Sequence, residues 1–202
     1  MTNCYLVTDE KTSKSLIIDP GGISRELDEQ INKLGLENIK YIILTHGHFD
    51  HIRKVARYKK LTGAQVVANV DEIPLIEDEE NNLSKRYTKG VDCFEVEKQL
   101  NDGDEFLLGE TKIKMISTPG HTKGCACFIV EDCIFSGDTL MKDCIGRCDL
   151  PTGNQEDMIN SLQKLSNFKT NYKIYPGHGE ETSLKYEKGS NLYLNFWAKR
   201  KI

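Results

Sequence analysis

Short apolar runs, mostly closed by Gly, Pro or Asp, recur along the chain. They are rich in β-branched and aromatic residues, a composition typical of β-strands. Eight of these runs are predicted to be strands: Cys4–Val7, Ser15–Asp19, Lys40–Thr45, Ala64–Ala68, Thr111–Thr118, Cys125–Val130, Cys133–Asp138 and Tyr172–Gly177.

Four other segments carry apolar positions at helical spacing. They are Ser24–Gly35, Asp50–Lys60, Asn154–Phe168 and Ser183–Trp197. Ser24 is expected to cap the first of these helices and Gly35 to follow its last turn. By contrast, the segment Glu77–Gly90 is polar and aperiodic, and we expect it to be a plain surface loop, with a loop that overhangs a site as the alternative. Strands interrupted by helices in this way predict two sheets covered by helices.

Length and charge narrow the classes of protein that remain. The 202 residues favour a single domain spanning residues 1–202. The net charge is −4 and there is no long basic run, so neither nucleic acid nor a membrane is expected as a partner. The N-terminus lacks a basic segment followed by an apolar stretch, and the apolar runs are far too short to span a bilayer. We therefore expect a cytoplasmic protein.

The chain contains seven cysteines, at positions 4, 93, 125, 127, 133, 144 and 148. An odd number without an export signal argues against a disulfide framework. Most are expected to be reduced, buried thiols with no role in a site. A zinc or redox pair at Cys144 and Cys148 is the alternative, although it lacks the paired CxxC spacing.

Three of the five histidines are crowded into the six residues from His46 to His51. His46 and His48 are two apart on an extended segment, so their imidazoles project the same way. Asp50 and His51 follow where the chain should turn into a helix, and such a turn lets neighbours point at different targets. Four ligands on one bend cannot easily all reach one ion, but they can divide between two adjacent ions. Imidazole and carboxylate together suit zinc, iron or manganese rather than calcium or magnesium.

The other two histidines, His121 and His178, each follow a strand-like run and a Pro-Gly turn. Asp138 occupies the same kind of position after CIFSG. Loops at strand ends can converge on one rim, so these side chains are expected to meet the cluster. Any one histidine alone would more often be a structural residue. Because none of the five lies outside this pattern, a metal site is favoured over that interpretation.

These motifs resemble a known family over nearly the whole chain. THGHFDH, GH at His121, GD at Asp138 and GHG at His178, with NCYLV and IIDPGG near the start, resemble the metallo-β-lactamase-fold hydrolases. IGRCDLPTGNQEDM and PGHGEETSLKYEKGSNLYL further resemble small, single-domain type II glyoxalases, the hydroxyacylglutathione hydrolase-like proteins. The resemblance implies an α/β (α+β) fold, an αββα sandwich of two mixed sheets flanked by helices, with metals at one edge between the sheets.

The resemblance also implies a binuclear centre, most simply of two zinc ions, with iron or manganese as alternatives. Its ligands would form two groups that share a carboxylate: His46, His48 and His121 for the first ion, Asp50, His51 and His178 for the second, and Asp138 between them. Asp19, in IIDPG, matches a family aspartate that supports the site without binding metal. A simple turn role for Asp19 is the alternative.

The reaction implied is hydrolysis of a thioester such as a hydroxyacyl-glutathione by a metal-bridging hydroxide, which Asp50 would orient. Full-length type II glyoxalases carry a separate C-terminal helical domain that grips glutathione. Only residues 179–202 follow the last predicted ligand, so no such domain is expected, and the reaction class carries over better than the identity of the thiol. Arg147 and Lys142 are expected to meet an anionic substrate. The alternatives are a solvated surface role for Lys142 and, for Arg147, a role in fixing the GRCDLPTG loop.

Three other functions compete with thioester hydrolysis. Lactone or phosphoester hydrolysis would use the same site. A mononuclear iron persulfide dioxygenase has the same fold, with one iron held by two His and an Asp, and GRCD resembles that branch. Against it, His51 and His178 complete a second group of ligands. A non-catalytic metal-binding or scaffold protein would be marked by a missing ligand, and none is missing.

Overall fold

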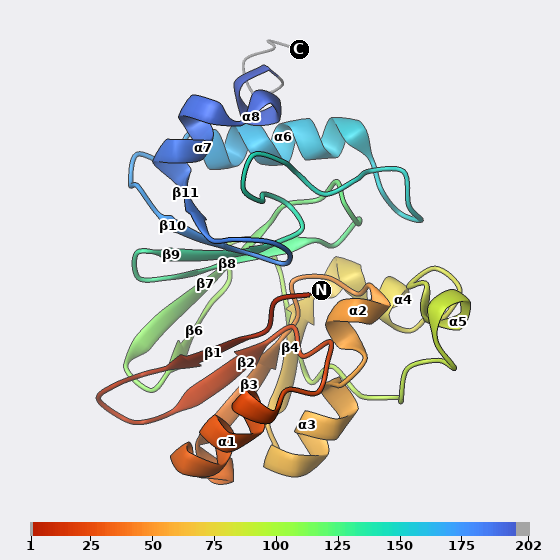
Figure 1. Ribbon diagram of the computed structural model, residues 1–202, viewed down its shortest axis with the longest axis vertical. Coiled ribbons are helices and arrows are strands. Elements are labelled where there is room, and N and C mark those ends of the chain that lie inside the picture. The colour runs from red at the N-terminus through yellow and green to blue at the C-terminus, as the bar shows by residue number, and fades with distance from the viewer. Residues whose placement is uncertain (1, 197–202) are drawn as a thin grey trace.

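Two β-sheets lie face to face, and helices cover the outer face of each, in the computed structural model, which describes residues 2–196 (Figure 1). The first sheet runs in the order β1 (Tyr5–Thr8), β2 (Ser15–Ile18), β3 (Ile39–Ile43), β4 (Gln65–Asn69) and β5 (Lys98–Leu100). The second runs in the order β11 (Thr182–Ser183), β10 (Lys173–Pro176), β9 (Cys133–Gly137), β8 (Ala126–Val130), β7 (Thr111–Ser117) and β6 (Glu105–Leu108).

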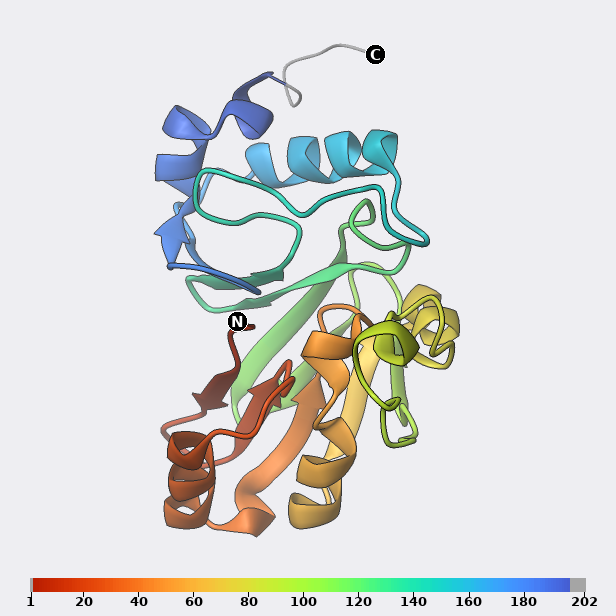
Figure 2. The same cartoon turned by 45° about the vertical axis from the view of Figure 1, so that its right-hand side comes forward.

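Both sheets are mixed. In the first, β1 is antiparallel to β2, whereas β2, β3, β4 and β5 pair in parallel. In the second, β9 and β10 are the parallel pair and the other neighbours are antiparallel. Each sheet is built from one half of the chain, as the change of colour from one sheet to the other shows (Figure 2). The predicted sandwich of two mixed sheets flanked by helices is thereby confirmed.

The helices belong to three places in the fold. Those outside the first sheet are α1 (Arg25–Leu34) and α3 (Val55–Thr62), with the 3-10 turn η1 (Leu36–Asn38) between α1 and β3 (Figure 1). Those outside the second sheet are α6 (Gln155–Ser166), α7 (Leu184–Ser190) and α8 (Leu192–Phe196). Those beyond the ends of β3 and β4 are α2 (Phe49–Ile52), η2 (Val70–Glu72), α4 (Ile73–Ile76) and α5 (Ser84–Tyr87).

Three apolar clusters fill the interfaces between these layers. Phe128, Met115 and Leu16 belong to the cluster between the sheets and are fully buried. Ile31 and Ile42 are among the residues that pack α1 and α3 on the first sheet, and a third cluster joins α6 to the second sheet. Each fully buried side chain of this size contributes about 1.5–3 kcal/mol by leaving water. Within residues 2–196 no helix is both long and apolar enough to cross a membrane.

All eight predicted strands are present, and the first predicted helix has the expected caps. The Ser24 hydroxyl accepts a hydrogen bond from the backbone N–H of Leu27, and Gly35 ends α1 with φ of +89°. Three predictions were wrong in detail. Ser183–Trp197 is not one helix but two, α7 and α8, and Trp197 lies outside the described residues. Asp50–Lys60 is not one helix, because the N–H of Lys54 donates to the carbonyl of Pro20, and the chain breaks between α2 and α3. The expected loop Glu77–Gly90 contains the short helix α5.

The cysteines are all free thiols, as expected, but most of them are not buried. Cys125 and Cys127 are buried, and burial raises the pKa of Cys127 to about 11, which keeps that thiol protonated. Cys144 is exposed and Cys148 partly buried. All seven lie in the described part of the chain, and none belongs to a group of side chains arranged to hold a metal ion. The zinc alternative for Cys144 and Cys148 therefore gains no support.

A buried carboxylate ties two turns together at the edge of the sandwich. Asp9, in the β1–β2 turn, accepts hydrogen bonds from the backbone N–H groups and hydroxyls of Thr12 and Thr111 and from the N–H of Glu110. The Thr111 hydroxyl, helped by the other donors and opposed by burial, holds the pKa of Asp9 well below its usual range.

Replacement of this carboxylate is expected to destabilise the fold in a pH-dependent way. A depressed folded-state pKa stabilises the protein at pH values above the unfolded pKa of about 4, and this contribution is lost as the pH falls below it. Asp9→Asn should therefore lower the urea midpoint at pH 7, and the gap to the native protein should narrow at pH 3. Urea denaturation at the two pH values measures this, and an equal gap at both would contradict it.

Candidate metal centre

The predicted ligands converge at one edge of the sandwich, between the two sheets. They come from five points of the chain, each within a few residues of a strand end or in α2: His46 and His48 after β3, Asp50 and His51 in α2, His121 after β7, Asp138 after β9, and His178 after β10. Their ligand atoms form three overlapping groups: His46, His48 and His121; His46, His51 and Asp138; and Asp50, His51 and His178. Within each group the atoms lie within 4.8 Å of one another.

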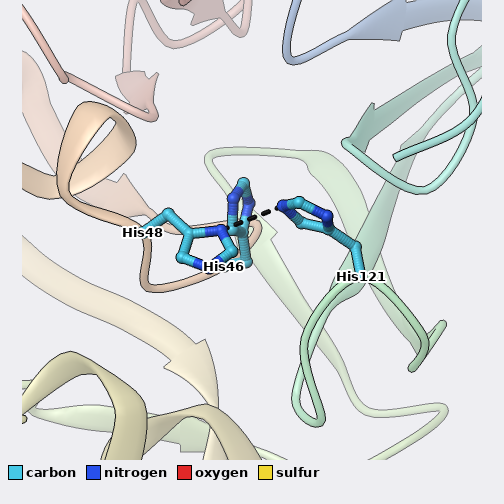
Figure 3. A group of neighbouring side chains, drawn as sticks. All are labelled: His46, His48 and His121. Carbon is cyan, nitrogen blue, oxygen red and sulfur yellow. Dashed lines mark hydrogen bonds between the residues drawn. The ribbon is translucent and has the colours of Figure 1, made fainter. Parts of the chain in front are cut away.

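The first group consists of three imidazoles that point toward one another (Figure 3). Nδ1 of His48 lies 2.9 Å from Nε2 of His121, and the buried Nε2 of His46 has no hydrogen-bond partner among residues 2–196. Burial and the neighbouring imidazoles lower the pKa of His46 far below its usual value, and that of His48 to about 3. These rings are therefore neutral near pH 7, the form in which imidazole binds metal.

The second group lies beside the first and includes a carboxylate. Nε2 of His178 is 3.4 Å from both Oδ2 of Asp50 and Nε2 of His51. Burial opposes ionisation of Asp50, but the hydrogen bond with His178, the charge of His51 and the Thr2 hydroxyl outweigh it and lower its pKa below the usual range. Asp50 is thus an anion at neutral pH, ready to meet a cation.

Asp138 lies between the two groups and is nearly buried. Its Oδ2 is 3.5 Å from Nε2 of both His121 and His178, and its Oδ1 is 3.6 Å from Nε2 of His51. In the described part of the chain this Oδ1 has no hydrogen-bond partner, although it is shielded from water. A buried carboxylate oxygen without a partner is costly. Divalent metal ions would supply the missing partners for Oδ1 and for Nε2 of His46, so the residues present fit such ions.

Asp19 supports this cluster from behind, as the resemblance implied. Its Oδ1 accepts from the Thr45 N–H at 2.8 Å, and its Oδ2 accepts from the Thr45 hydroxyl at 2.6 Å and lies 2.9 Å from Nδ1 of His51. Burial lowers the pKa of His51, but Asp19 together with Asp138 and Asp50 outweighs it and raises that pKa to about 9. The contact at Nδ1 leaves Nε2 of His51 facing the group.

Loss of the Asp19 charge is expected to weaken the second group selectively. Asp19→Asn keeps a residue that tolerates the observed φ of +50°, but its amide no longer holds Nδ1 of His51 as a charged acceptor. Zinc affinity at the second group, Asp50, His51 and His178, should fall about 10- to 100-fold. Stepwise affinities from chelator competition measure this, and two unchanged affinities would contradict it.

Glycine is required where the chain passes close to Asp138. A Cβ built on Gly177 would lie 2.2 Å from Oδ1 of Asp138 and 2.8 Å from Cε1 of His51. A Cβ on Gly146 would lie 2.2 Å from the Asp138 carbonyl oxygen and 2.9 Å from Nδ1 of His121. Side chains at these two positions would displace the predicted ligands.

A cavity of about 330 Å³ opens onto the cluster. Its lining combines predicted ligands with apolar side chains: His48, Asp50, His121, Asp138 and His178 with Phe49, Leu83, Met141, Gly146, Arg147 and Leu150. Larger hollows of about 490 and 790 Å³ lie elsewhere and have no histidine in their linings. The segment expected to be a plain loop forms one side of the site, because Tyr87 stacks on Phe49 and the Phe49 N–H donates to the Asn82 carbonyl.

The two cations expected to meet substrate are both paired with acidic side chains. Arg147 lines the cavity and makes a two-pronged ion pair with Asp149, while Lys142 pairs with Glu180. The carbonyl of Arg147 also lies 2.7 Å from Nδ1 of His121, so this residue orients an imidazole through its backbone. Substrate contact by either side chain stays a prediction.

Sequence reasoning missed two residues that touch the cluster. Thr2 donates its hydroxyl to Oδ2 of Asp50 at 2.7 Å, and Thr45 contacts both Asp19 and Nδ1 of His46. Thr45 directly precedes the cluster, so its position was a usable signal. Nothing around Thr2 marks it, because 48 positions separate it from its partner.

Comparison with known proteins identifies the class. The model of the metallo-beta-lactamase superfamily matches residues 1–178. Among curated relatives, hydroxyacylglutathione hydrolase GloC of Haemophilus influenzae is 33% identical over 198 residues, 96% of this chain and 92% of that protein. Two solved structures are 28% identical to this chain: BLEG-1 B3 metallo-beta-lactamase, with a TM-score of 0.84 over 96% of this chain and 94% of its own, and TTHA1623 in a di-iron-bound form, with 0.83 over 96% and 95%.

The chain belongs to the metallo-beta-lactamase superfamily. Its clustered imidazoles and carboxylates suit divalent metal ions, and the metal-dependent hydrolases are the class that fold and site define together.

Proposed function

We propose that this protein is a binuclear metallohydrolase that cleaves a thioester, such as a hydroxyacyl-glutathione. One observation carries the proposal: Asp138 lies between two groups of potential ligands at the mouth of a cavity. Six predicted ligands and the carboxylate of Asp138 would then hold two ions, as the family resemblance implies. The name of the relative from Haemophilus influenzae supports the choice of a thioester.

The residues of this chain would prepare the attacking group and the substrate. Two bound divalent ions would lower the pKa of a water molecule toward neutrality and stabilise negative charge on the attacked carbonyl oxygen. Asp50 would accept a hydrogen bond from the attacking group at its carboxylate, and the Thr2 hydroxyl at Oδ2 fixes the orientation of that carboxylate. The exposed fraction of the Asp50 side chain, 33%, leaves it accessible from the cavity.

The leaving group needs little help from the protein. A thiol has a pKa near 8.5, so its thiolate departs without a strong acid beside it. The apolar wall of the cavity, formed by Phe49, Leu83, Met141 and Leu150, would contact the carbon skeleton of the substrate. Among residues 2–196, Arg147 is the one Arg or Lys in the cavity lining, so its side chain would meet an anionic group of the thiol.

The experiment measures the hydrolysis of S-lactoylglutathione by protein loaded with zinc and by protein loaded with iron. The rate is monitored through the release of free thiol. The lactoyl thioester of N-acetylcysteamine is tested beside it, because this compact thiol lacks the glutathione carboxylates. Turnover of either compound supports thioester hydrolysis, and the ratio of the two kcat/KM values measures how much the glutathione portion contributes. No turnover of either would overturn the proposed reaction.

A persulfide dioxygenase is the alternative that the same samples can test. Such an enzyme would bind one iron per chain and consume oxygen in the presence of glutathione persulfide. The proposed hydrolase binds two ions and consumes no oxygen. The second group of ligands, Asp50, His51 and His178, favours two ions.

A further inference from the structure

A buried carboxylate outside the predicted ligand set joins the two loops that carry the first group. Glu72, the last residue of η2, is 1% exposed. Its Oε1 accepts a hydrogen bond from the N–H of Gly47 at 2.7 Å. Its Oε2 accepts from the hydroxyl of Thr122 at 3.0 Å and from the N–H of Gly124 at 2.8 Å. Both oxygens are therefore occupied, and each serves a different loop.

The donors are neighbours of the predicted ligands. Gly47 separates His46 from His48, and Thr122 directly follows His121. The contact between Nδ1 of His48 and Nε2 of His121, at 2.9 Å, spans the same two loops (Figure 3). Glu72 lies outside the lining of the cavity, so it would touch neither substrate nor metal. Its influence on the site would pass through the backbone of these loops.

Close packing holds the two loops against the segment that contains Glu72. A Cβ on Gly124 would lie 2.2 Å from the backbone N of Glu72. A Cβ on Gly47 would lie 2.9 Å from Cγ1 of Ile76 and 3.3 Å from Oε1 of Glu72. Gly124 thus packs directly on the backbone of Glu72, and Gly47 packs on Ile76 and on the Glu72 carboxylate, so the carboxylate spans a fixed distance between the two loops.

We propose that Glu72 is a positioning residue of the metal centre, which sets the spacing between the His46–His48 loop and the His121 loop so that three imidazoles converge on one ion. The inference rests on the proposed metal centre. A carboxylate is suited to this task because it accepts on both oxygens at once. The isosteric amide of glutamine has only one accepting oxygen, so in its place one of the two loop N–H groups would face an amide N–H.

The test measures zinc binding by Glu72→Gln through competition with a chromophoric chelator. It is done at pH 8, above the value of about 7 to which burial raises the pKa of Glu72. One of the two zinc affinities should fall about 10- to 100-fold, and the ion at the group containing Asp50 should be retained. Cobalt substitution shows which ion is lost, because a site of three imidazoles with the shared carboxylate of Asp138 differs in its visible spectrum from a site to which Asp50 adds a second carboxylate.

Asp9→Asn is the matched control, because Asp9 is also a buried carboxylate that joins two turns, but away from the site. It should lower stability and leave both zinc affinities unchanged. Thr122→Val removes a single donor to Oε2 and preserves the shape of the side chain, so it tests the inference even if Glu72→Gln fails to fold. A loss of a few-fold in the same affinity is expected.

Two results would overturn the inference. In the first, the native protein binds two zinc ions and Glu72→Gln binds both with unchanged affinity. If that variant does not fold, unchanged affinities in Thr122→Val count as the same result. This outcome leaves the proposed metal centre intact. In the second, the native protein binds no zinc or iron, and the metal centre falls together with the inference. The two failures are distinguished by the native protein alone.

Discussion

Asp138→Asn is expected to weaken the binding of both metal ions and to reduce turnover to less than about one hundredth of the native rate. Oδ2 of the carboxylate lies 3.5 Å from Nε2 of both His121 and His178, and Oδ1 lies 3.6 Å from Nε2 of His51, so the carboxylate faces both groups of potential ligands. An amide keeps only one accepting oxygen and turns an N–H toward part of this cluster. Loss of a supporting partner alone costs about 10- to 100-fold in affinity or activity, and loss of a shared ligand should cost more.

Asp132, just before the other end of β9, provides a control. Asp132 precedes β9 as Asp138 follows it, but its side chain is 64% exposed and forms a surface pair with Lys173 at 3.8 Å. Asp132→Asn should bind two ions and retain the native rate. Metal content and kcat of the two variants are measured after identical loading. An Asp138→Asn protein with both ions and full activity would refute the assignment.

Removal of metal is expected to lower the melting temperature by about 8–16 °C. Without cations, five imidazoles and the carboxylates of Asp50 and Asp138 are held in a largely buried cluster. An ion present at about 1,000 times its dissociation constant adds about 4 kcal/mol to stability. In a chain of this length each kcal/mol shifts the melting temperature by about 2–4 °C.

Calorimetry in zinc and in a chelator measures this shift. The native protein should show the full difference, and Asp138→Asn, with its weakened sites, a much smaller one. If the chelator leaves the native melting temperature unchanged after the ions have been shown to be removed, metal binding and folding are not coupled at this site.

The sequence predicted those elements whose side-chain pattern matches their burial. Eight strands were found because their apolar residues are rich in β-branched and aromatic types. β6 was missed because two of its three apolar residues are leucine, and because the alternation in its burial, with Leu107 57% exposed, has no counterpart in residue type. β5 has a single apolar residue and is defined by its pairing with β4. Such strands depend on a neighbour that local patterns do not contain.

The residues of the candidate site were likewise predicted only where the local sequence carries a signal. Five of the seven predicted ligands stand out because histidine is rare in this chain and its positions follow strand ends, and Asp50 and Asp138 occupy the same kind of position. Glu72 did not stand out, because one acid in the stretch VDEIPLIEDEE looks like any other until the fold places it beneath two loops. The break at Lys54 likewise depends on a carbonyl at Pro20. Contacts across long sequence separations were the part that pattern reading could not reach.

The division of the chain between the two sheets bears on how the protein assembles. Residues 5–100 build the first sheet and residues 105–183 the second. Each group of potential ligands draws on both, since His48 meets His121 and Asp50 meets His178. Neither half can therefore complete a group alone, and metal uptake should come late in folding, after the halves have docked. An ion in either group would be bound by residues from both halves of the chain. It would therefore bind only after the two sheets have packed, and it would hold them together.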